Sequence, residues 1–340
     1  MYKKILKRKK QNDMKLLITG GAGYIGSVIT NLALQQGYQV KVIDTLWFKK
    51  DIPLIHMNNP NYQFIRGDIC DKNVAEKIIK GVDFIINAAA VVGDPASKKY
   101  PDLTYKTNYE ACINLAELAK KNKIKGFIFF STCSNYGIAN GLANEGTELN
   151  PLSVYAKSKV KSEEYLMNKI NGLDWVICRL STVYGVSPRM RFDLTVNDFA
   201  MNAYTKKYLD IFLPYSHRPY IHVYDLTKVI MELLKNFEKI KNNVFNVGFN
   251  GENYQKIQIA NIVKENIPDT KIEIVKTGGD LRDYQVDFSK LQKFISIKNT
   301  YTINDGVKEV LEILKNKIIA DPYKDYYYDT LPDIGGNKSE

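Results

Sequence analysis

A tyrosine and a lysine separated by three residues are the first candidates for chemistry. Tyr155 and Lys159 fall in the run YAKSK, and helix positions i and i+4 lie on one face. A phenol with an ordinary pKa of about 10 is a weak base near neutrality, and a neighbouring ammonium stabilises the phenolate. The pair can then take a proton from a hydroxyl group. Because the chain holds 23 Tyr, a solvated helix face is the alternative interpretation of the spacing alone.

A hydroxyl-rich run, STCSNYG at residues 131–137, precedes this helix. It follows the apolar segment GFIFF, which is typical of a buried strand. A hydroxyl at the carboxyl end of such a strand can hydrogen-bond a reacting oxygen and relay its proton, and Thr132 suits this role. Cys133 adds a thiol beside it. A small packing residue is the other interpretation of Cys133, since free cysteine usually behaves as a small buried apolar group.

Three glycines, Gly20, Gly23 and Gly26, form a G-x-x-G-x-x-G pattern between a strand-like and a helix-like segment. The first allows a tight turn, the second lets the backbone approach a pyrophosphate, and the third lets the helix pack closely on the strand. The helix N-terminus then offers free N–H groups and a positive dipole end to the phosphates. The pattern and its placement predict a dinucleotide site.

Two aspartates follow the next strand-like segments. Asp44 lies 18 positions after Gly26, where a carboxylate accepts hydrogen bonds from the adenosine ribose and repels a 2′-phosphate, which favours NAD over NADP. Lys49 and Lys50 lie nearby and could pair with a 2′-phosphate, so NADP stays an alternative cofactor. The other interpretation of Asp44 is a turn residue at the end of a strand. Asp68 can meet the adenine edge or cap a loop.

The elements that must position these residues alternate between strand and helix, which is typical of βαβ units. The sequence predicts an α/β fold: a doubly wound Rossmann-type parallel sheet with a smaller mixed α/β substrate lobe towards the C-terminus. We expect strands at Lys15–Thr19, Gln39–Asp44, Tyr62–Arg66, Asp83–Asn87, Gly126–Ser131, Trp175–Leu180, Tyr220–Val223, Val244–Val247 and Lys271–Val275. We expect helices at Ile25–Gln36, Asn73–Lys80, Tyr105–Asn122, Val154–Lys169, Phe192–Tyr208, Leu226–Asn236, Gln255–Glu265 and Ile303–Lys315.

The same alternation predicts the domain limits. We expect a basic disordered leader at 1–13, with Met14 as an alternative start, and an NAD-binding domain at 14–186 to which 216–248 return. The substrate lobe takes 187–215 and 249–318. A tail follows at 319–340, and its Tyr326, Tyr327 and Tyr328 can pack on the body or on a partner.

Composition excludes several classes of protein. With 45% hydrophobic and 25% charged residues the chain is typical of a globular enzyme, and no run approaches the ~20 apolar residues of a membrane span. Of the net charge of +11, residues 1–13 carry +5 without interleaved aromatics, which argues against a nucleic-acid site. Four scattered cysteines favour reduced thiols and a cytoplasmic location. The histidines form no metal pattern, so we expect no metal and a buried hydrogen bond for His222.

Taken in order, the motifs resemble those of extended short-chain dehydrogenases/reductases of the nucleotide-sugar epimerase/dehydratase group, in particular UDP-glucose 4-epimerase-like proteins. The matching segments span about residues 14–315: TGGAGYIGS, NAAA at 87–90, TNYEACINL, STCSNYG, YAKSK and RPYIHVYD. The resemblance implies NAD as cofactor, a nucleotide-diphosphate sugar as substrate, and a homodimer formed through the helices 105–122 and 154–169.

The resemblance also implies roles for individual residues. Thr132, Tyr155 and Lys159 would be the catalytic set, with Arg218 and Arg282 clamping the diphosphate, as suits a guanidinium fork. Pairing of these arginines with surface aspartates is the other interpretation. Segment 189–197 would face the nucleotide-sugar, with Ser134 and Asn197 as substrate contacts. The NAD site would be lined by Gly20, Gly23, Tyr24, Ile25, Gly26, Asp44, Asp68, Ile69, Ala88 and Asn108, together with Tyr155 and Lys159.

The residues after Thr132 bear on the reaction. Dehydratases of the group carry Asp-Glu there, whereas this chain has Cys133-Ser134, so we expect no water elimination by the usual route. We expect 4-epimerisation through a transient 4-keto sugar, in surface polysaccharide synthesis. Two alternatives are a nucleotide-linked 4-keto-sugar reductase and a C3/C5 epimerase using Cys133, although such epimerases carry Cys at the position of Ser134. A catalytically silent NAD-binding regulator is the third alternative, against which the intact Thr132, Tyr155 and Lys159 count.

Overall fold

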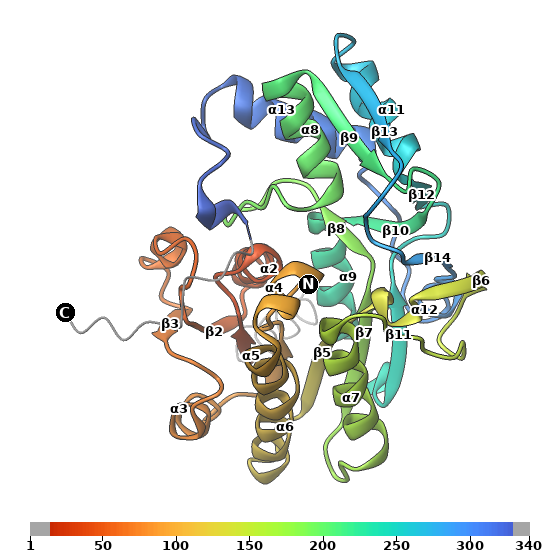
Figure 1. The fold of residues 1–340 in the computed structure, drawn as a ribbon. Helices are drawn as coiled ribbons and strands as arrows, with labels where there is room; N and C mark the ends of the chain where they lie inside the picture. Colours follow the sequence, from red (N-terminus) through yellow and green to blue (C-terminus); the bar gives the residue numbers. More distant parts are fainter. Residues whose placement is uncertain (1–13, 329–340) are drawn as a thin grey trace.

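A seven-stranded sheet forms the centre of the computed structural model, which describes residues 14–328 (Figure 1). The predicted leader and residues 329–340 of the predicted tail lie outside the described residues. All neighbouring strands are parallel, in the order β11-β7-β5-β4-β1-β2-β3, which confirms the predicted fold class. The strands are β1 (Lys15–Thr19), β2 (Gln39–Asp44), β3 (Tyr62–Arg66), β4 (Phe84–Asn87), β5 (Gly126–Thr132), β7 (Trp175–Leu180) and β11 (Asn243–Val247).

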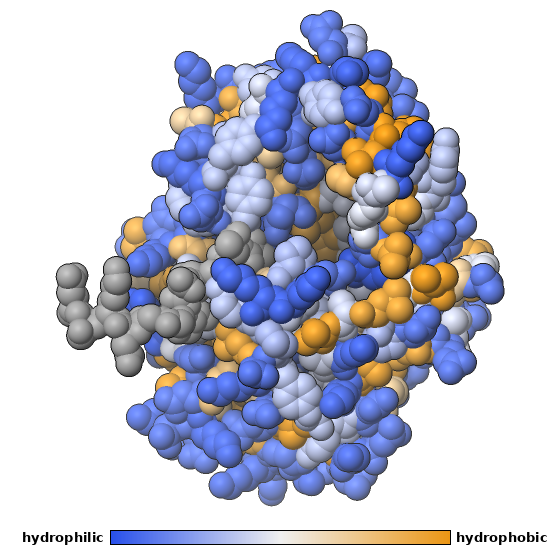
Figure 2. Space-filling view, viewed as in Figure 1, coloured by the Kyte–Doolittle hydropathy of each residue, from blue (hydrophilic) through white to orange (hydrophobic). Residues whose placement is uncertain are grey.

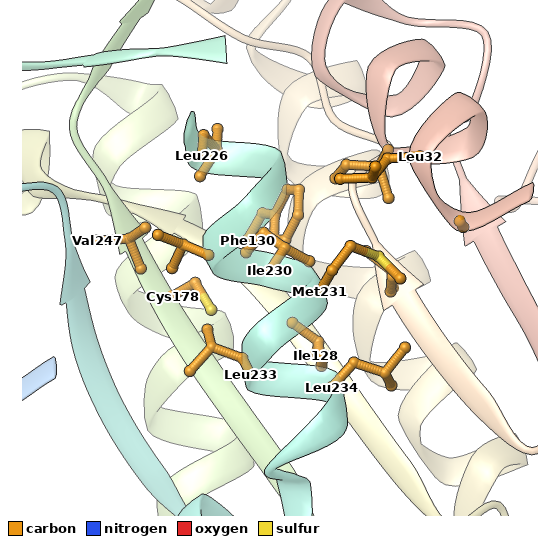
Figure 3. Close-up of a cluster of buried hydrophobic side chains, with 14 of the residues drawn as sticks. Leu32, Ile128, Phe130, Cys178, Leu226, Ile230, Met231, Leu233, Leu234 and Val247 are labelled. Carbon is orange, nitrogen blue, oxygen red and sulfur yellow. The ribbon is translucent and has the colours of Figure 1, made fainter. Parts of the chain in front are cut away.

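Alternating side chains along each strand supply two separate cores. In β1, Leu16 and Ile18 face one core and Leu17 faces the other. Helices α2 (Tyr24–Gln35) and α9 (Val223–Lys235) cover the first face. Figure 3 shows the apolar side chains of α9 directed onto β5 and β7. The second face is covered by α3 (Lys72–Ile78), α6 (Ala111–Lys121) and α7 (Val154–Asn168). This burial fixes the sheet as a rigid base for its loops.

The predicted helix Tyr105–Asn122 is interrupted. It divides into α5 (Pro101–Tyr105), a π-helical turn at Lys106–Glu110, and α6. A π turn holds one residue more than an α turn and is frequent at functional sites. It contains Asn108, which is buried and bonds both polar backbone groups of Val91 at 2.9 Å. The irregular turn thus holds the loop that follows β4.

A smaller lobe packs beside the sheet, at the top of Figure 1. Its helices α8 (Thr195–Lys206), α11 (Lys256–Asn266) and α13 (Ile303–Lys315) enclose a third core. The predicted helix Phe192–Tyr208 is shorter because Lys207 adopts a left-handed conformation with φ +55° and ends it. The short strands are β6 (Ile138–Ala143), β8 (Thr182–Tyr184), β9 (Tyr208–Phe212), β10 (His217–His222), β12 (Asn253–Gln255), β13 (Lys271–Val275) and β14 (Asp283–Val286).

The remaining elements tie the lobe to the sheet. Helix α12 (Ser289–Phe294), within the predicted lobe segment 249–318, returns to β11 and places Leu291 in the first core. The tail packs back as well, since Tyr327 is buried against Phe192. The other short elements are α4 (Asp94–Lys99), α10 (Phe237–Ile240) and the 3₁₀ turns Ile52–His56, Cys133–Tyr136 and Asp325–Tyr327.

Hydrophilic side chains cover most of the face seen in Figure 2. Between residues 14 and 328, the helices are too short or too polar to span a bilayer.

A buried ion pair fixes the end of β5. The Glu163 carboxylate on α7 accepts hydrogen bonds from Arg179 Nη2 at 2.6 Å and Nε at 3.0 Å, from Asn135 Nδ2 at 2.8 Å, and from the Ser131 hydroxyl. Glu163 is fully buried and Arg179 nearly so. One carboxylate therefore joins β5, β7, α7 and the turn after Thr132.

Removing one partner of this pair tests its role. Arg179→Met leaves Glu163 as an uncompensated buried charge, and we expect a loss of about 3–5 kcal/mol in the free energy of unfolding. Urea unfolding of the two proteins measures it. Arg66→Met, the same change at an exposed arginine, is the control and should cost less than ~0.5 kcal/mol. A similar loss in both variants would contradict the assignment.

Candidate active site

The glycine loop follows β1 and opens α2 as predicted from the sequence. Gly20 has φ +69°, and a Cβ there would lie 2.8 Å from the Ala89 Cα atom. A Cβ on Gly26 would lie 2.1 Å from the Gly20 carbonyl oxygen, so neither position accepts a side chain without movement. The loop is thereby pressed against the end of the sheet, and the first N–H groups of α2 face the space in front of it.

A cavity opens at the carboxyl ends of β1, β2, β3 and β4. Of the predicted cofactor residues, nine line it: Gly20, Gly23, Tyr24, Ile25, Gly26, Asp44, Asp68, Ile69 and Ala88. Asn108, Tyr155 and Lys159 are outside this lining. The reversal of strand order between β1 and β4 is where a doubly wound sheet binds its dinucleotide. Glycine loop, acidic strand end and apolar walls together suit NAD.

The cavity residues that the sequence analysis missed include two aromatic side chains and two arginines: Trp47, Phe48, Arg189 and Arg191. The Arg189 guanidinium stacks over the Phe48 ring at 4.0 Å from its centroid. Trp47 and Phe48, which follow Asp44 by three and four positions, could have been recognised in the sequence as cavity residues. The arginines could not, because they lie more than 140 positions further on, in the segment expected to face the nucleotide-sugar.

The two predicted carboxylates of this cavity are held by backbone groups. Asp44 accepts hydrogen bonds from the N–H groups of Ala22 at 3.1 Å and Leu46 at 2.9 Å. Burial raises the pKa of Asp44, while these bonds and the Arg189 charge oppose the rise. Asp68 accepts from the Cys70 N–H at 2.9 Å and caps its loop. Asp44 thus links the glycine loop to the end of β2.

Thr132, Tyr155 and Lys159 meet at the end of β5. The Thr132 hydroxyl, which accepts from the Ser134 N–H at 3.1 Å, is close enough to Tyr155 to influence its pKa, and Lys159 Nζ lies 6.0 Å from the centre of the Tyr155 ring. Lys159 donates to the Phe130 carbonyl at 2.8 Å and is 2% exposed. Ser153 caps the N-terminus of α7, and its hydroxyl accepts from the Ala156 N–H. The cap and the i, i+4 spacing turn both side chains towards β5.

The protonation of this group is shifted by burial. Burial raises the pKa of Tyr155 to about 12, and the neighbouring Thr132 hydroxyl and the charges of Arg282 and Arg191 oppose the rise. Burial lowers the pKa of Lys159 to about 8. With no cofactor bound, Tyr155 is therefore a neutral phenol at neutral pH. Further positive charge beside it favours the phenolate.

The Cys133 thiol is directed away from these groups. Cys133 is fully buried, and its Sγ atom donates to the Arg179 carbonyl at 3.2 Å. Burial raises the pKa of Cys133 far above its ordinary value. It packs with Tyr136 and Phe288, whereas Ser134 points to Arg282, whose Nη1 donates to its hydroxyl at 2.7 Å.

Arg218 and Arg282 are brought together although 64 positions separate them. The carboxylate of Asp280 lies 2.9 Å from Arg218 Nη2 and 2.6 Å from Arg282 Nη2. Burial opposes ionisation of Asp280, but the two guanidinium groups outweigh it and hold its pKa well below the usual range. The surface pairs considered for these arginines, with Asp225 and Asp283, are not formed: Asp225 bonds Thr300 and Lys228, and Asp283 lies beside His217. One partly exposed carboxylate thus holds two arginines side by side.

Asn197 lies in the joint between lobe and sheet. Its amide donates to Arg191 O at 2.9 Å and to Tyr24 Oη at 3.2 Å, and accepts from the Gly185 N–H at 3.0 Å. Tyr24 Oη in turn donates to the Gly185 carbonyl at 2.6 Å. The side chain is fully buried, so the contacts of Asn197 are with the protein.

His222 also lies in this joint. Its Nε2 is 2.9 Å from Glu309 Oε2, and its ring accepts from the Tyr224 N–H. The expectation of a buried hydrogen bond for His222 is met.

The buried ammonium predicts a pH-dependent stability. A lysine with a folded pKa of about 8 and an unfolded pKa of about 10.4 binds fewer protons in the folded state between those values, so stability rises with pH across that window. We expect cofactor-free Lys159→Met to be more stable than the parent by about 2 kcal/mol at pH 7, after the lost bond to Phe130 is deducted.

Urea unfolding at pH 7, 8, 9 and 10 measures this difference, which should shrink above pH 8. Lys157→Met, at an exposed site on the same helix, is the control and should show no such trend. A difference that stays constant with pH would contradict the assignment.

Several known proteins are similar to this chain in sequence and in fold. Residues 16–248 match the NAD dependent epimerase/dehydratase family. A putative UDP-glucose 4-epimerase of Methanocaldococcus jannaschii is 29% identical, with 88% of this chain and 98% of that protein covered. UDP-glucuronic acid decarboxylase 4 of Arabidopsis thaliana is also 29% identical, with 93% and 72% covered.

A solved structure extends the comparison. UDP-glucuronic acid 4-epimerase of Bacillus cereus, in complex with UDP-glucuronic acid and NAD, is 26% identical, has a TM-score of 0.81, and is covered to 99% by 89% of this chain. The family predicted from the motifs is confirmed, and with it an enzyme of NAD-dependent nucleotide-sugar chemistry. The chain belongs to the NAD dependent epimerase/dehydratase family.

Proposed function

We propose that the protein is an NAD-dependent epimerase that inverts C4 of a nucleotide-activated sugar through a transient 4-keto intermediate. The observation that carries the proposal is the grouping of Thr132, Tyr155 and Lys159, with no carboxylate at the two positions after Thr132. Inversion at C4 needs a proton acceptor and a hydride acceptor at one carbon and no second acid or base.

Each residue of the group has a defined task. Tyr155 takes the proton of the sugar C4 hydroxyl as phenolate and returns it as phenol, and the neighbouring Thr132 hydroxyl holds the same oxygen. Lys159 supplies a fixed positive charge that favours the phenolate. NAD, when bound beside this group, would supply the reversible hydride acceptor that the C4 oxidation needs. The 4-keto sugar must rotate in the site between the removal and the return of the hydride, so that the hydride can reach its opposite face. The site therefore needs space for this rotation.

Substrate binding is assigned to the arginine pair. Arg218 and Arg282 lie side by side in the lobe, with the Ser134 hydroxyl 2.7 Å from Arg282 Nη1. Two guanidinium groups suit a diphosphate, which carries two negative charges and offers pairs of oxygen atoms that accept two N–H groups at once. Arg282 is close enough to lower the pKa of Tyr155, which supports a diphosphate site beside the reacting sugar.

The alternative C3/C5 epimerase is less well supported. It needs a thiol or thiolate that reaches the sugar, whereas the Cys133 thiol is buried and bonded to the Arg179 carbonyl. The 4-keto-sugar reductase uses the same residues as the proposed epimerase, and the two differ in whether the hydride returns to the same sugar.

The biological setting is part of the same proposal. We assign the enzyme to the cytoplasm, to surface polysaccharide synthesis and to a homodimer formed through α6 and α7. The four cysteines are free, as in a reducing compartment, and α6 and α7 pack side by side on one face of the sheet.

Removing the phenol hydroxyl tests the assignment of the base. We expect Tyr155→Phe to lower kcat by about 10³-fold, as loss of a general base does, with NAD content unchanged. Tyr165→Phe, on the same helix and bonded to Glu117, is the control. Turnover and bound NAD, measured together on a UDP-sugar panel, decide the point. Near-parental activity of Tyr155→Phe would refute the assignment.

Isotope exchange tests the reaction. We expect a UDP-sugar incubated in D₂O without added cofactor to give an isomer that contains no deuterium, because the hydride returns within the site. Mass spectrometry and NMR of the products measure this. An isomer containing deuterium would place carbon-acid chemistry at C3 or C5, and loss of water would indicate a dehydratase. Turnover that requires added reduced cofactor would indicate the reductase.

A further inference from the structure

A second carboxylate, from the loop after β4, joins the arginine pair. Asp94 Oδ2 lies 3.1 Å from Arg282 Nη2. Asp94 is the first residue of α4, which follows β4, and α4 packs by Ala96 against Val91 next to the NAD cavity. Arg282 directly precedes β14. Figure 1 shows α4 near the centre and β14 to its right. The pair therefore connects the loop after β4 with the segment that carries the diphosphate clamp.

The two carboxylates bind Arg282 at different edges. Nε and Nη2 form the side edge of the guanidinium group, and Asp280 occupies both, at 2.8 and 2.6 Å. Nη1 and Nη2 form the end edge, where Ser134 accepts from Nη1 and Asp94 lies against Nη2. A guanidinium group has five N–H donors. Asp280 and Ser134 accept hydrogen bonds from three of them, and the Asp94 carboxylate forms an ion pair with Nη2, so a phosphate cannot contact both Nη1 and Nη2 while Asp94 is in place.

The Asp280 contact is local and built in. Asp280 is two positions before Arg282 and also accepts from its backbone N–H at 3.1 Å. The Asp94 contact joins residues 188 positions apart. The Asp94 and Asp280 side chains are similarly exposed, at 36% and 32%, so the separation along the chain and not the exposure distinguishes them. Gly93, with φ +81°, precedes Asp94 and permits a change of backbone direction there. Of the two carboxylates, Asp94 is the one that can leave.

Charge balance gives the reason for it to leave. Arg218 and Arg282 carry two positive charges, and Asp94 and Asp280 compensate both. A diphosphate that entered with both carboxylates in place would add two uncompensated negative charges. Like charges in contact at a partly buried site repel each other more strongly than they do in water. Departure of Asp94 removes that contact and frees the end edge of Arg282 for the phosphate.

We propose that Asp94 is a carboxylate latch, which occupies the end edge of Arg282 in the substrate-free enzyme and gives it up to the substrate diphosphate. The inference rests on the proposed function in so far as Arg218 and Arg282 bind that diphosphate. The latch competes with every diphosphate ligand. It therefore weakens binding of substrate and product alike and speeds product release.

Binding of diphosphates to Asp94→Asn tests the latch. Asparagine keeps the size of the side chain but removes its charge, so we expect the Kd for inorganic pyrophosphate and for UDP to fall about 5-fold or more. Isothermal titration at low salt measures both, and the gain should shrink at 0.5 M salt because of screening. Asp102→Asn, an exposed acid on α5, is the matched control and should leave both Kd values within about 2-fold. Arg282→Lys should bind both ligands more weakly.

The outcomes separate the latch from the proposed function. Tighter pyrophosphate binding by Asp94→Asn supports the latch even if no UDP-sugar is turned over, a result that would overturn only the proposed function. Unchanged or weaker binding of both ligands by Asp94→Asn overturns the latch. Absence of pyrophosphate binding in every variant overturns it too, because the latch requires an anion site at Arg282.

Discussion

The buried carboxylate of Glu163 is the interaction on which the site depends. It binds Arg179 of β7, Ser131 of β5 and Asn135 of the following turn, and it is carried by the helix that carries Tyr155. Any rotation of α7 or slip of β5 would leave a charge without partners in the interior, at a cost of several kcal/mol. The distance between strand end and helix is thereby fixed, as a proton transfer between their side chains requires.

Above this anchor, the site places positive charge where the reaction needs it. Lys159 is buried with a single carbonyl partner, which makes the folded protein less stable than it would be with an apolar residue. The Asp280 carboxylate lies against both Arg218 and Arg282 and offsets the repulsion between their positive charges. Neither the Lys159 ammonium nor the arginine pair is needed for folding. Their positive charges stabilise the anions of the reaction, the Tyr155 phenolate and the substrate diphosphate. Stability is exchanged for function at these positions.

The sequence predicts the parts of the site that are local. Gly20 and Gly26 lie within one turn, and Tyr155 and Lys159 lie on one helix, so spacing alone defines their geometry. The β strands follow from apolar runs for the same reason. The stacking of Arg189 on Phe48 has no local signature, because its partners are joined only by the closed fold. The π turn around Asn108 and the inward direction of the Cys133 thiol depend on single backbone turns, which periodicity does not resolve.

The return of α12 to the sheet has a consequence for how new specificities arise. The chain passes from sheet to lobe after β8, back through α9 and β11, out again, and back once more at α12. No single cut separates the lobe, so a recombination event at one junction would leave each half without part of its core. A change of sugar or nucleotide must therefore come from substitutions within the lobe. The catalytic sheet and the lobe that determines substrate specificity must therefore evolve together within one chain.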